Sequence, residues 1–277
     1  MLCKGTTIIR IGRSGITSYC RCFEINNRIK LPVETMKEKT KERMKADYAA
    51  DIPMDPALLD DAWQQTRKYP LHWLKPNGFE SWPGEKQKNI GRRLREKASA
   101  RLLWNETHLA VGVEMEDSDV VAEGTRDQDH LYLQGDTIEV FIKPLKANYY
   151  WELYGTPNNL KTVFFYPSRG YLFLPSCAKQ KAEITVCTKV FGTLNDWRKR
   201  DMGWNMIMKI PLAMLTRHGL EFETGEWSIM IGRQNYSAFL PFKELSSVPK
   251  LSCPDFHLYE EYAIITLNDS KKTISQK

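Results

Sequence analysis

The stretch HLYLQGDTIEVFIKP, residues 130–144, alternates apolar and polar side chains after a Gly-Asp turn. Alternation with a period of two predicts a strand with one buried face, because successive side chains point to opposite sides of a sheet. Ile142 then belongs to the core face, and Glu139 lies on the other face beside Phe141. The aromatic ring indicates that this second face is not plain solvent, so Glu139 becomes the first candidate binding residue.

Segments of similar length and pattern recur along the chain, separated by turn residues such as Pro157-Asn158-Asn159. Together with one or two short helices they predict an all-β protein, built as a jelly-roll-like, two-sheet antiparallel β-sandwich. One helix is expected over residues 55–66, with Asp55 as its N-cap and Pro56 at its first position. The strand-like segments are ARLLWNETHLAVGVEMED, DTIEVFIKP, NYYWELYG, LKTVFFYP, GYLFLP, AEITVCTKV, GWNMIMKIP, EWSIMIGRQNYS and EYAIITL.

The net charge of +6 is unevenly distributed along the 277 residues. Residues 1–47 hold 11 Lys and Arg against 5 Asp and Glu, whereas the remainder holds 29 of each. We therefore expect residues 1–45 to be a flexible basic tail, residues 46–270 to form the β-sandwich, and residues 271–277 to be a C-terminal tail. A neutral body disfavours nucleic acid as a partner.

No apolar run approaches the roughly eighteen residues of a membrane span. Arg10 and Arg13 interrupt the apolar residues at the start, so the chain as written shows no export signal, which by itself indicates the cytoplasm. The six cysteines have no CxxC spacing, which disfavours zinc. A disulfide between Cys177 and Cys187 across a hairpin stays open as an alternative to reduced thiols.

The order of the segments resembles the family 9 carbohydrate-binding modules. The likeness runs from about residue 50 to residue 268 and is carried by DIPMDPALLDDAW, DTIEVFI, YYWELYG, FGTLNDWRKRDMGWNMIMKIPLAML, WSIMIGRQN and DFHLYEEYAIITL. The resemblance implies non-catalytic binding of an oligo- or polysaccharide such as xylan, in association with glycoside hydrolases. It also implies an exported protein, in conflict with the missing export signal.

The resemblance places the sugar in a cleft on the face of Glu139, whose carboxylate would accept hydrogen bonds from sugar hydroxyls. Well-known members clamp the ring between two tryptophans, and this chain departs from them with Tyr132 and Phe256 near those positions. Arg233 would donate to vicinal oxygens. The candidate carbohydrate-binding residues are Trp82, Tyr132, Glu139, Tyr150, Glu152, Tyr154, Arg233, Phe256 and His257.

Structural roles compete with these assignments. Arg233 could form a salt bridge with Glu139 or Glu152, the two rings could serve as packing, and a lone His257 is more often structural. Family members also carry structural calcium, and carboxylate oxygens suit that ion. A possible calcium site is therefore expected at Asp117, Asp119 and Asp127, with Asp129 on the same loop.

Two other classes of function remain open. Glu139 and Glu152 on adjacent strands could form the two-carboxylate site of a glycoside hydrolase. A haem-binding sandwich domain of a redox protein would need an axial methionine. The candidates for that ligand are Met115, Met206, Met208 and Met230.

Overall fold

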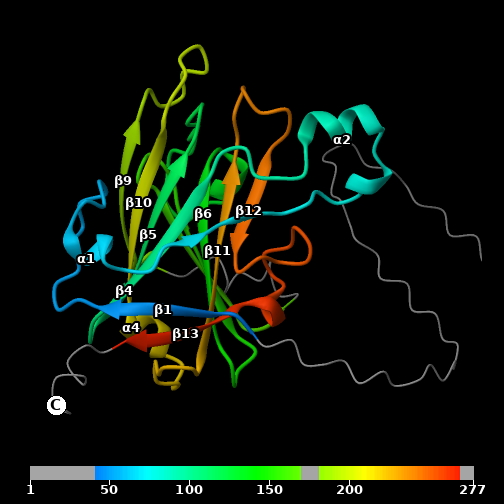
Figure 1. Ribbon diagram of the computed structural model, residues 1–277. Helices are drawn as coiled ribbons and strands as arrows, with labels where there is room; N and C mark the ends of the chain where they lie inside the picture. Colours follow the sequence, from blue (N-terminus) through cyan, green and yellow to red (C-terminus); the bar gives the residue numbers. More distant parts are fainter. Residues whose placement is uncertain (1–40, 170–180, 269–277) are drawn as a thin grey trace, which may run out of the picture. The chain divides into compact units, whose positions relative to one another are not determined.

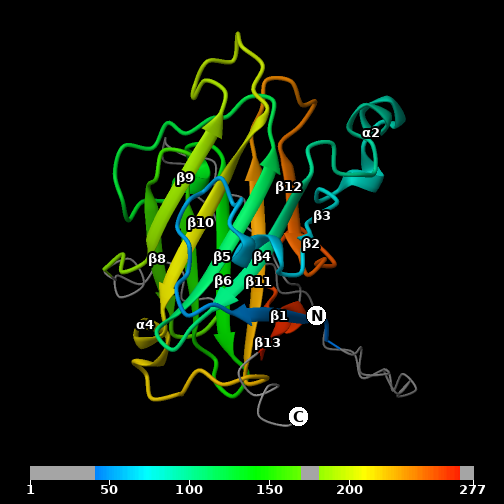
Figure 2. The same ribbon diagram turned by 60° about the vertical axis from the view of Figure 1, so that its left-hand side comes forward.

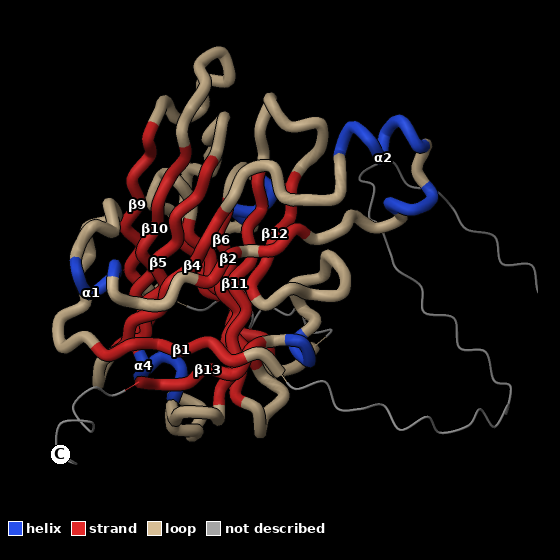
Figure 3. Tube along the Cα trace, viewed as in Figure 1, coloured by secondary structure: helices blue, strands red, loops and turns tan. Residues whose placement is uncertain are grey.

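The computed structural model describes residues 41–169 and 181–268. Strands dominate it (Figure 3), which confirms the expected all-β class. The strands are β1 (Arg43–Tyr48), β2 (Tyr69–Pro70), β3 (His72–Trp73), β4 (Ala98–Trp104), β5 (His108–Glu116), β6 (Thr137–Pro144), β7 (Tyr150–Gly155), β8 (Lys161–Tyr166), β9 (Thr185–Phe191), β10 (Gly203–Pro211), β11 (Trp227–Asn235), β12 (Glu244–Val248) and β13 (Ala263–Asn268). The helices are α1 (Asp61–Gln64), α2 (Gly84–Ile90) and α4 (Leu212–Thr216), with 3-10 turns η1 (Phe79–Ser81), η2 (Leu131–Leu133) and η3 (Tyr259–Glu261).

The strands join in one hydrogen-bonded network, whereas the sequence predicted two separate sheets. Its path runs β8-β7-β6-β11-β13-β1-β4-β5-β10-β9, and β12 pairs with β11 and β3. Pairing along this path is antiparallel except at β1, which is parallel to both β13 and β4. In Figure 1, β1 and β13 cross the lower ends of the other strands. These two strands connect the layers, so the sheet is barrel-like.

The main core lies between two layers of strands. Figure 2 shows β9, β10, β5 and β4 in front of β8, β6 and β11. Alternate residues of both layers meet in one cluster of buried apolar side chains, including Leu102 and Val111 from one layer and Val140 and Leu153 from the other. The period-two pattern thus creates a shared core from strands distant in sequence.

Strand β1 extends the body beyond its expected boundary. Met44 and Ala46 are fully buried in the main core, whereas Arg43 and Lys45 face solvent. The boundary expected at residue 46 therefore falls inside a strand. The basic residues of this segment hid it, because they occupy the exposed positions of an alternating pattern.

The helix expected over residues 55–66 is shorter than its pattern indicated. The carboxylate of Asp60, not that of Asp55, caps it by accepting from the amide of Ala62 at 2.8 Å. Leu58 has a φ of 55°, a left-handed conformation that breaks the preceding turn.

No helix in the described ranges is long and apolar enough to cross a membrane. The expected strand at 170–175 and Cys177 lie outside the described residues.

Helix α1 covers the outer face of β4, β5 and β10. Its Trp63 packs with Leu58, Leu103 and other apolar side chains in a separate buried cluster. Gly112 makes this approach possible, because a Cβ atom there would lie 2.9 Å from the Trp63 ring. The outer face of this layer is therefore partly closed by the segment that precedes β2.

Candidate functional site

The face of β6 that carries Glu139 is covered by an aromatic cluster. Phe141, Tyr150 and Tyr154 belong to this cluster, whereas Trp151 and Leu153 belong to the main core. The alternation predicted for β6 and β7 is therefore confirmed. The remaining members of the aromatic cluster are Leu74, Leu131, Phe164, Tyr166, Met230, Leu251, Phe256 and Tyr262.

Two acids are buried on this face: Glu139 is 2% exposed and Glu152 is 3% exposed. The side-chain amide of Gln234 donates to Oε1 of Glu139, and the hydroxyl of Tyr154 donates to Oε1 of Glu152 at 2.5 Å. Oε2 of Glu152 has no hydrogen-bond partner within the described part of the chain. Burial, and then the neighbouring Glu152, raise the pKa of Glu139 well above its usual value.

Three half-buried side chains lie next to these acids. The ring of Tyr132 meets that of Tyr154 edge-on at 6.0 Å, and burial together with the charges of the two acids raises its pKa. Tyr236 donates its hydroxyl to the Tyr132 carbonyl at 2.8 Å, and Lys243 donates to that hydroxyl at 2.6 Å. Burial lowers the pKa of Lys243 to about 8, although Glu139 opposes the shift.

We call this group the Glu139 cluster. It consists of Tyr132, Glu139, Glu152, Tyr154, Gln234, Tyr236 and Lys243. Carboxyl, amide, phenol and ammonium groups are brought together beside an aromatic ring. Such a mixture can accept and donate hydrogen bonds to a polar ligand while its ring covers an apolar surface.

Arg233 lies on the opposite side of β11, which corrects its expected place at the cleft. Its side chain is fully buried and donates to Oδ2 of Asp117 at 3.0 Å and to the Glu96 carbonyl at 3.2 Å. The alternative, a salt bridge to Glu139 or Glu152, is not formed either, because Arg233 pairs with Asp117. Burial raises the pKa of Asp117 to about 6 even with Arg233 beside it.

Phe256 and His257 cover the face beside the Glu139 cluster. The ring of Phe256 is 8% exposed and lies on Gly232, where a Cβ atom would come within 2.7 Å of the ring. Nδ1 of His257 lies 2.8 Å from the hydroxyl of Tyr150, and its ring meets Phe141 at 5.2 Å. Phe256 is therefore packed against the sheet rather than open for stacking.

Trp82 belongs to a different group of rings. It lies 5.7 Å from Phe79 and 5.4 Å from Phe242, and the ammonium of Lys86 sits 4.0 Å from its centroid. These contacts place Trp82 beside α2 and the β11–β12 loop. It is not part of the Glu139 cluster.

The aspartates expected to hold calcium are engaged separately. Asp117 pairs with Arg233, Asp119 accepts from the amide of Ala238 at 2.8 Å, and Asp127 pairs with Lys161 at 2.7 Å. Across residues 41–169 and 181–268, no three His, Cys, Asp or Glu side chains form a group that could hold a metal ion. In the described residues, Asp117, Asp119 and Asp127 therefore do not converge on one point, and the calcium site stays a prediction.

The methionines considered as haem ligands are core residues. Met115, Met206 and Met208 are buried in the main core, and Met230 is buried in the aromatic cluster. Their sulfur atoms pack among apolar side chains. The structure therefore offers none of them as an axial ligand.

Sequence reasoning missed Gln234, Tyr236 and Lys243. A local signal existed for Gln234, because alternation from Ile231 puts Arg233 on the core side of β11 and Gln234 on the other side. No comparable signal marked Tyr236 and Lys243. They reach the cluster through the hairpin between β11 and β12. A loop has no repeating side-chain pattern from which the direction of its residues could be predicted.

No family model and no curated protein matches the sequence. Solved structures do match it. A protein from Bacteroides uniformis, provisionally described as carbohydrate-binding, aligns over 82% of this chain and 99% of its own, with 12% identity and a TM-score of 0.56. The overall fold is shared with that protein, and the similarity expected from the sequence is confirmed at the level of fold.

Two family 9 carbohydrate-binding module structures from Caldicellulosiruptor kristjanssonii also match. The glucose complex covers 82% of this chain and 96% of its own, with 15% identity and a TM-score of 0.47. The cellotriose complex covers 83% and 96%, with 13% identity and a TM-score of 0.48. At these identities, similarity concerns the fold and leaves the ligand of this chain open.

Proposed function

We propose that this protein binds a saccharide at the Glu139 cluster without cleaving it. The observation that carries the proposal is the buried Oε2 atom of Glu152, which has no donor within the described residues. A buried acceptor without a donor costs about 1–3 kcal/mol, and sugar hydroxyls are donors of the required kind. The fold shared with a protein described as carbohydrate-binding supports the same ligand class.

Tyr132 supplies the apolar surface that such a ligand needs. Pyranose rings bury their C–H face against an aromatic ring while their hydroxyls form hydrogen bonds at the edge. The half-buried ring of Tyr132 lies against Tyr154, whose hydroxyl already contacts Glu152. Because both acids are buried, binding of a sugar requires the side chains that cover them to move. Lys243 and Tyr236 then contribute further polar groups at the rim.

The same proposal includes a role in polysaccharide degradation, alongside glycoside hydrolases that act on xylan or cellulose. The alternative, a hydrolase that uses Glu139 and Glu152 as its two carboxyls, differs in one measurable respect. It requires turnover that disappears in Glu139→Gln. A binding module releases no sugar beyond a control without protein.

Binding is tested by calorimetric titration of the full chain with a panel of mono- and oligosaccharides derived from cellulose and xylan. We expect Tyr132→Ala to weaken binding of every sugar that binds, by about 1–3 kcal/mol, because it removes apolar contact area. Glu152→Gln should instead change the ranking among epimers, because it alters a directional acceptor.

Trp82→Ala provides the matched control, since it removes a half-buried ring outside the Glu139 cluster. Its affinities should equal those of the unmodified protein. Wild-type protein that binds no sugar in the panel contradicts the proposal. Equal losses in Trp82→Ala and Tyr132→Ala would also contradict it.

A further inference from the structure

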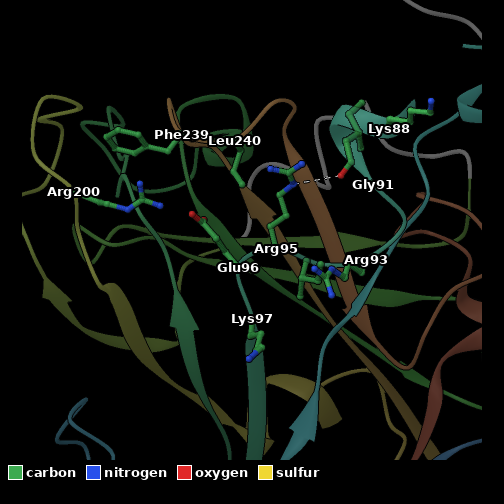
Figure 4. Close-up of a pocket in the computed structure, with 11 residues that line it drawn as sticks. Lys88, Gly91, Arg93, Arg95, Glu96, Lys97, Arg200, Phe239 and Leu240 are labelled. Carbon is green, nitrogen blue, oxygen red and sulfur yellow. Dashed lines mark hydrogen bonds between the residues drawn. The ribbon is translucent and has the colours of Figure 1, made fainter. Parts of the chain in front are cut away.

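A pocket lies apart from the Glu139 cluster, between the segment that joins α2 to β4 and the loops before β10 and β12 (Figure 4). Its volume is about 750 Å³, within the usual range of small-molecule sites. None of its lining residues belongs to the Glu139 cluster. The pocket and the Glu139 cluster therefore share no residue.

The pocket is strongly cationic although the body of the chain is neutral. Five basic side chains line it against a single carboxylate. The basic residues are Lys88, Arg93, Arg95, Lys97 and Arg200, and the acid is Glu96. A concave surface of one charge focuses the electrostatic field and concentrates ligands of the opposite sign.

Four of these cations have no acidic partner in the described part of the chain. In the described ranges, the side chains of Lys88, Arg93, Lys97 and Arg200 make no ion pair and donate no hydrogen bond. The neighbouring Arg92, by contrast, pairs with Glu80 at 3.1 Å. Unpaired like charges around one cavity repel one another, and an anionic ligand would relieve that repulsion.

The floor of the pocket is held in place by buried hydrogen bonds. The carboxylate of Glu244 accepts from the main-chain amides of Arg95 at 2.9 Å and Glu96 at 3.2 Å. Glu96 is itself buried, and its carboxylate accepts from the Ser118 amide at 3.1 Å and from the side chain of Asn235 at 2.7 Å. A backbone held in this way fixes the positions from which the Arg95 and Lys97 side chains extend.

The cations stand on opposite sides of the pocket. Figure 4 shows Arg200 and Phe239 at one side, with Arg93 and Lys88 toward the other. The guanidinium of Arg200 lies 5.0 Å from the ring centroid of Phe239, which is 40% exposed. A ligand that fills this pocket would meet positive charge at both ends, with the Phe239 ring beside Arg200 at one of them.

We propose that this pocket binds a small ligand that carries two phosphate or sulfate groups. Guanidinium groups match such tetrahedral oxyanions through paired N–H donors, and a lysine adds a compact charge. Arg93 and Lys97 hold one anionic group and Arg200 holds the other. Phe239 packs beside the group that Arg200 holds. This assignment does not depend on sugar binding at Glu139.

The proposal is tested by calorimetric titration of the full chain with a bisphosphorylated disaccharide, with the matching disulfated disaccharide and with the unmodified parent disaccharide. We expect one or both anionic probes to bind and the neutral parent not to bind at this site. Stronger binding of the phosphorylated sugar identifies a phosphate ligand, and stronger binding of the sulfated sugar identifies a sulfate ligand. Affinity should fall as salt rises, because the contacts are ionic.

Arg93→Gln and Arg200→Gln should each weaken anion binding about tenfold or more, the loss expected for one charge-assisted contact. Arg92→Gln and Lys199→Gln are the matched controls, since each removes a neighbouring charge that is paired with an acid outside the pocket. The controls should retain wild-type affinity, and circular dichroism checks the fold of all four variants.

Three outcomes would overturn the assignment. One is the absence of binding by either anionic probe up to about 1 mM, the weak limit of a specific site. Another is an equal loss of affinity in pocket and control variants, which indicates attraction by net charge alone. The third is tight binding of single-stranded DNA with no binding of the small probes.

Discussion

Glu139 is almost fully buried next to a second acid, and its main polar contact is the side-chain amide of Gln234. Burial disfavours the charged form of a carboxyl group, and the neighbouring Glu152 disfavours it further. Both effects raise the pKa of Glu139. A neutral carboxyl is less costly to bury than a carboxylate, which is how an acid can occupy this face.

The raised pKa of Glu139 predicts how stability depends on pH. An acid whose pKa is higher in the folded state binds more protons when folded, so its contribution is fully present below the unfolded value of about 4.3. That contribution is lost as the pH rises toward the folded pKa. Glu139→Gln cannot ionise, so its stability does not suffer this loss. We therefore expect the thermal midpoint of Glu139→Gln to rise relative to that of the wild type as the pH increases from about 5 to about 8.

Differential scanning calorimetry at several pH values measures the difference. Glu223→Gln, which changes an exposed glutamate, is the control and should follow the wild type throughout. A Glu139→Gln midpoint that runs parallel to the wild type from pH 5 to pH 8 would show that Glu139 is not the group responsible.

Among the elements, strand β1 joins the two layers of the sheet although it is only six residues long. It pairs in parallel with β13 from Arg43 to Asp47 and with β4 at its last two residues. It thereby connects the layer of β11 to the layer of β4. Met44 anchors it in the main core.

We expect Met44→Ala to lower the free energy of unfolding by about 2–5 kcal/mol, the usual cost of truncating a large buried side chain. Arg43→Ala, on the exposed side of the same strand, should change it by no more than about 0.5 kcal/mol. Urea titration followed by tryptophan fluorescence measures both values. Similar effects of the two substitutions would mean that β1 does not contribute to the core in solution.

Considered as a whole, the described body has one main core that receives side chains from both layers. Leu102 on β4 and Leu153 on β7 are both fully buried members of it. Neither layer can lose its packing without exposing apolar surface of the other. The body should therefore unfold as one unit.

We predict that thermal unfolding shows a single transition, with the same midpoint by far-UV circular dichroism and by tryptophan fluorescence. Leu102→Ala and Leu153→Ala, one in each layer, should both shift this transition without splitting it. Two resolved transitions, one of them sensitive to only one of the two substitutions, would show that the layers unfold separately.

Much of the strand content could be predicted because alternation is local. The faces assigned to Glu139 and Tyr154 followed from a period of two, and the structure confirms both. The same rule would have put Arg233 on the core side of β11, but family resemblance suggested the cleft instead. The helix at residues 55–66 was overestimated, because spacing alone does not reveal the left-handed backbone at Leu58.

By itself, the sequence determined an all-β chain and the division of β6 and β7 into a core face and an outer face. Only the tertiary structure decided which polar groups meet. Arg233 pairs with Asp117 across 116 positions, and Gln234 bonds Glu139 across 95. These contacts depend on strand register and on loop packing, which no local pattern encodes. The continuous sheet has the same origin, because β1 and β13 lie at opposite ends of the described chain and become neighbours only on folding.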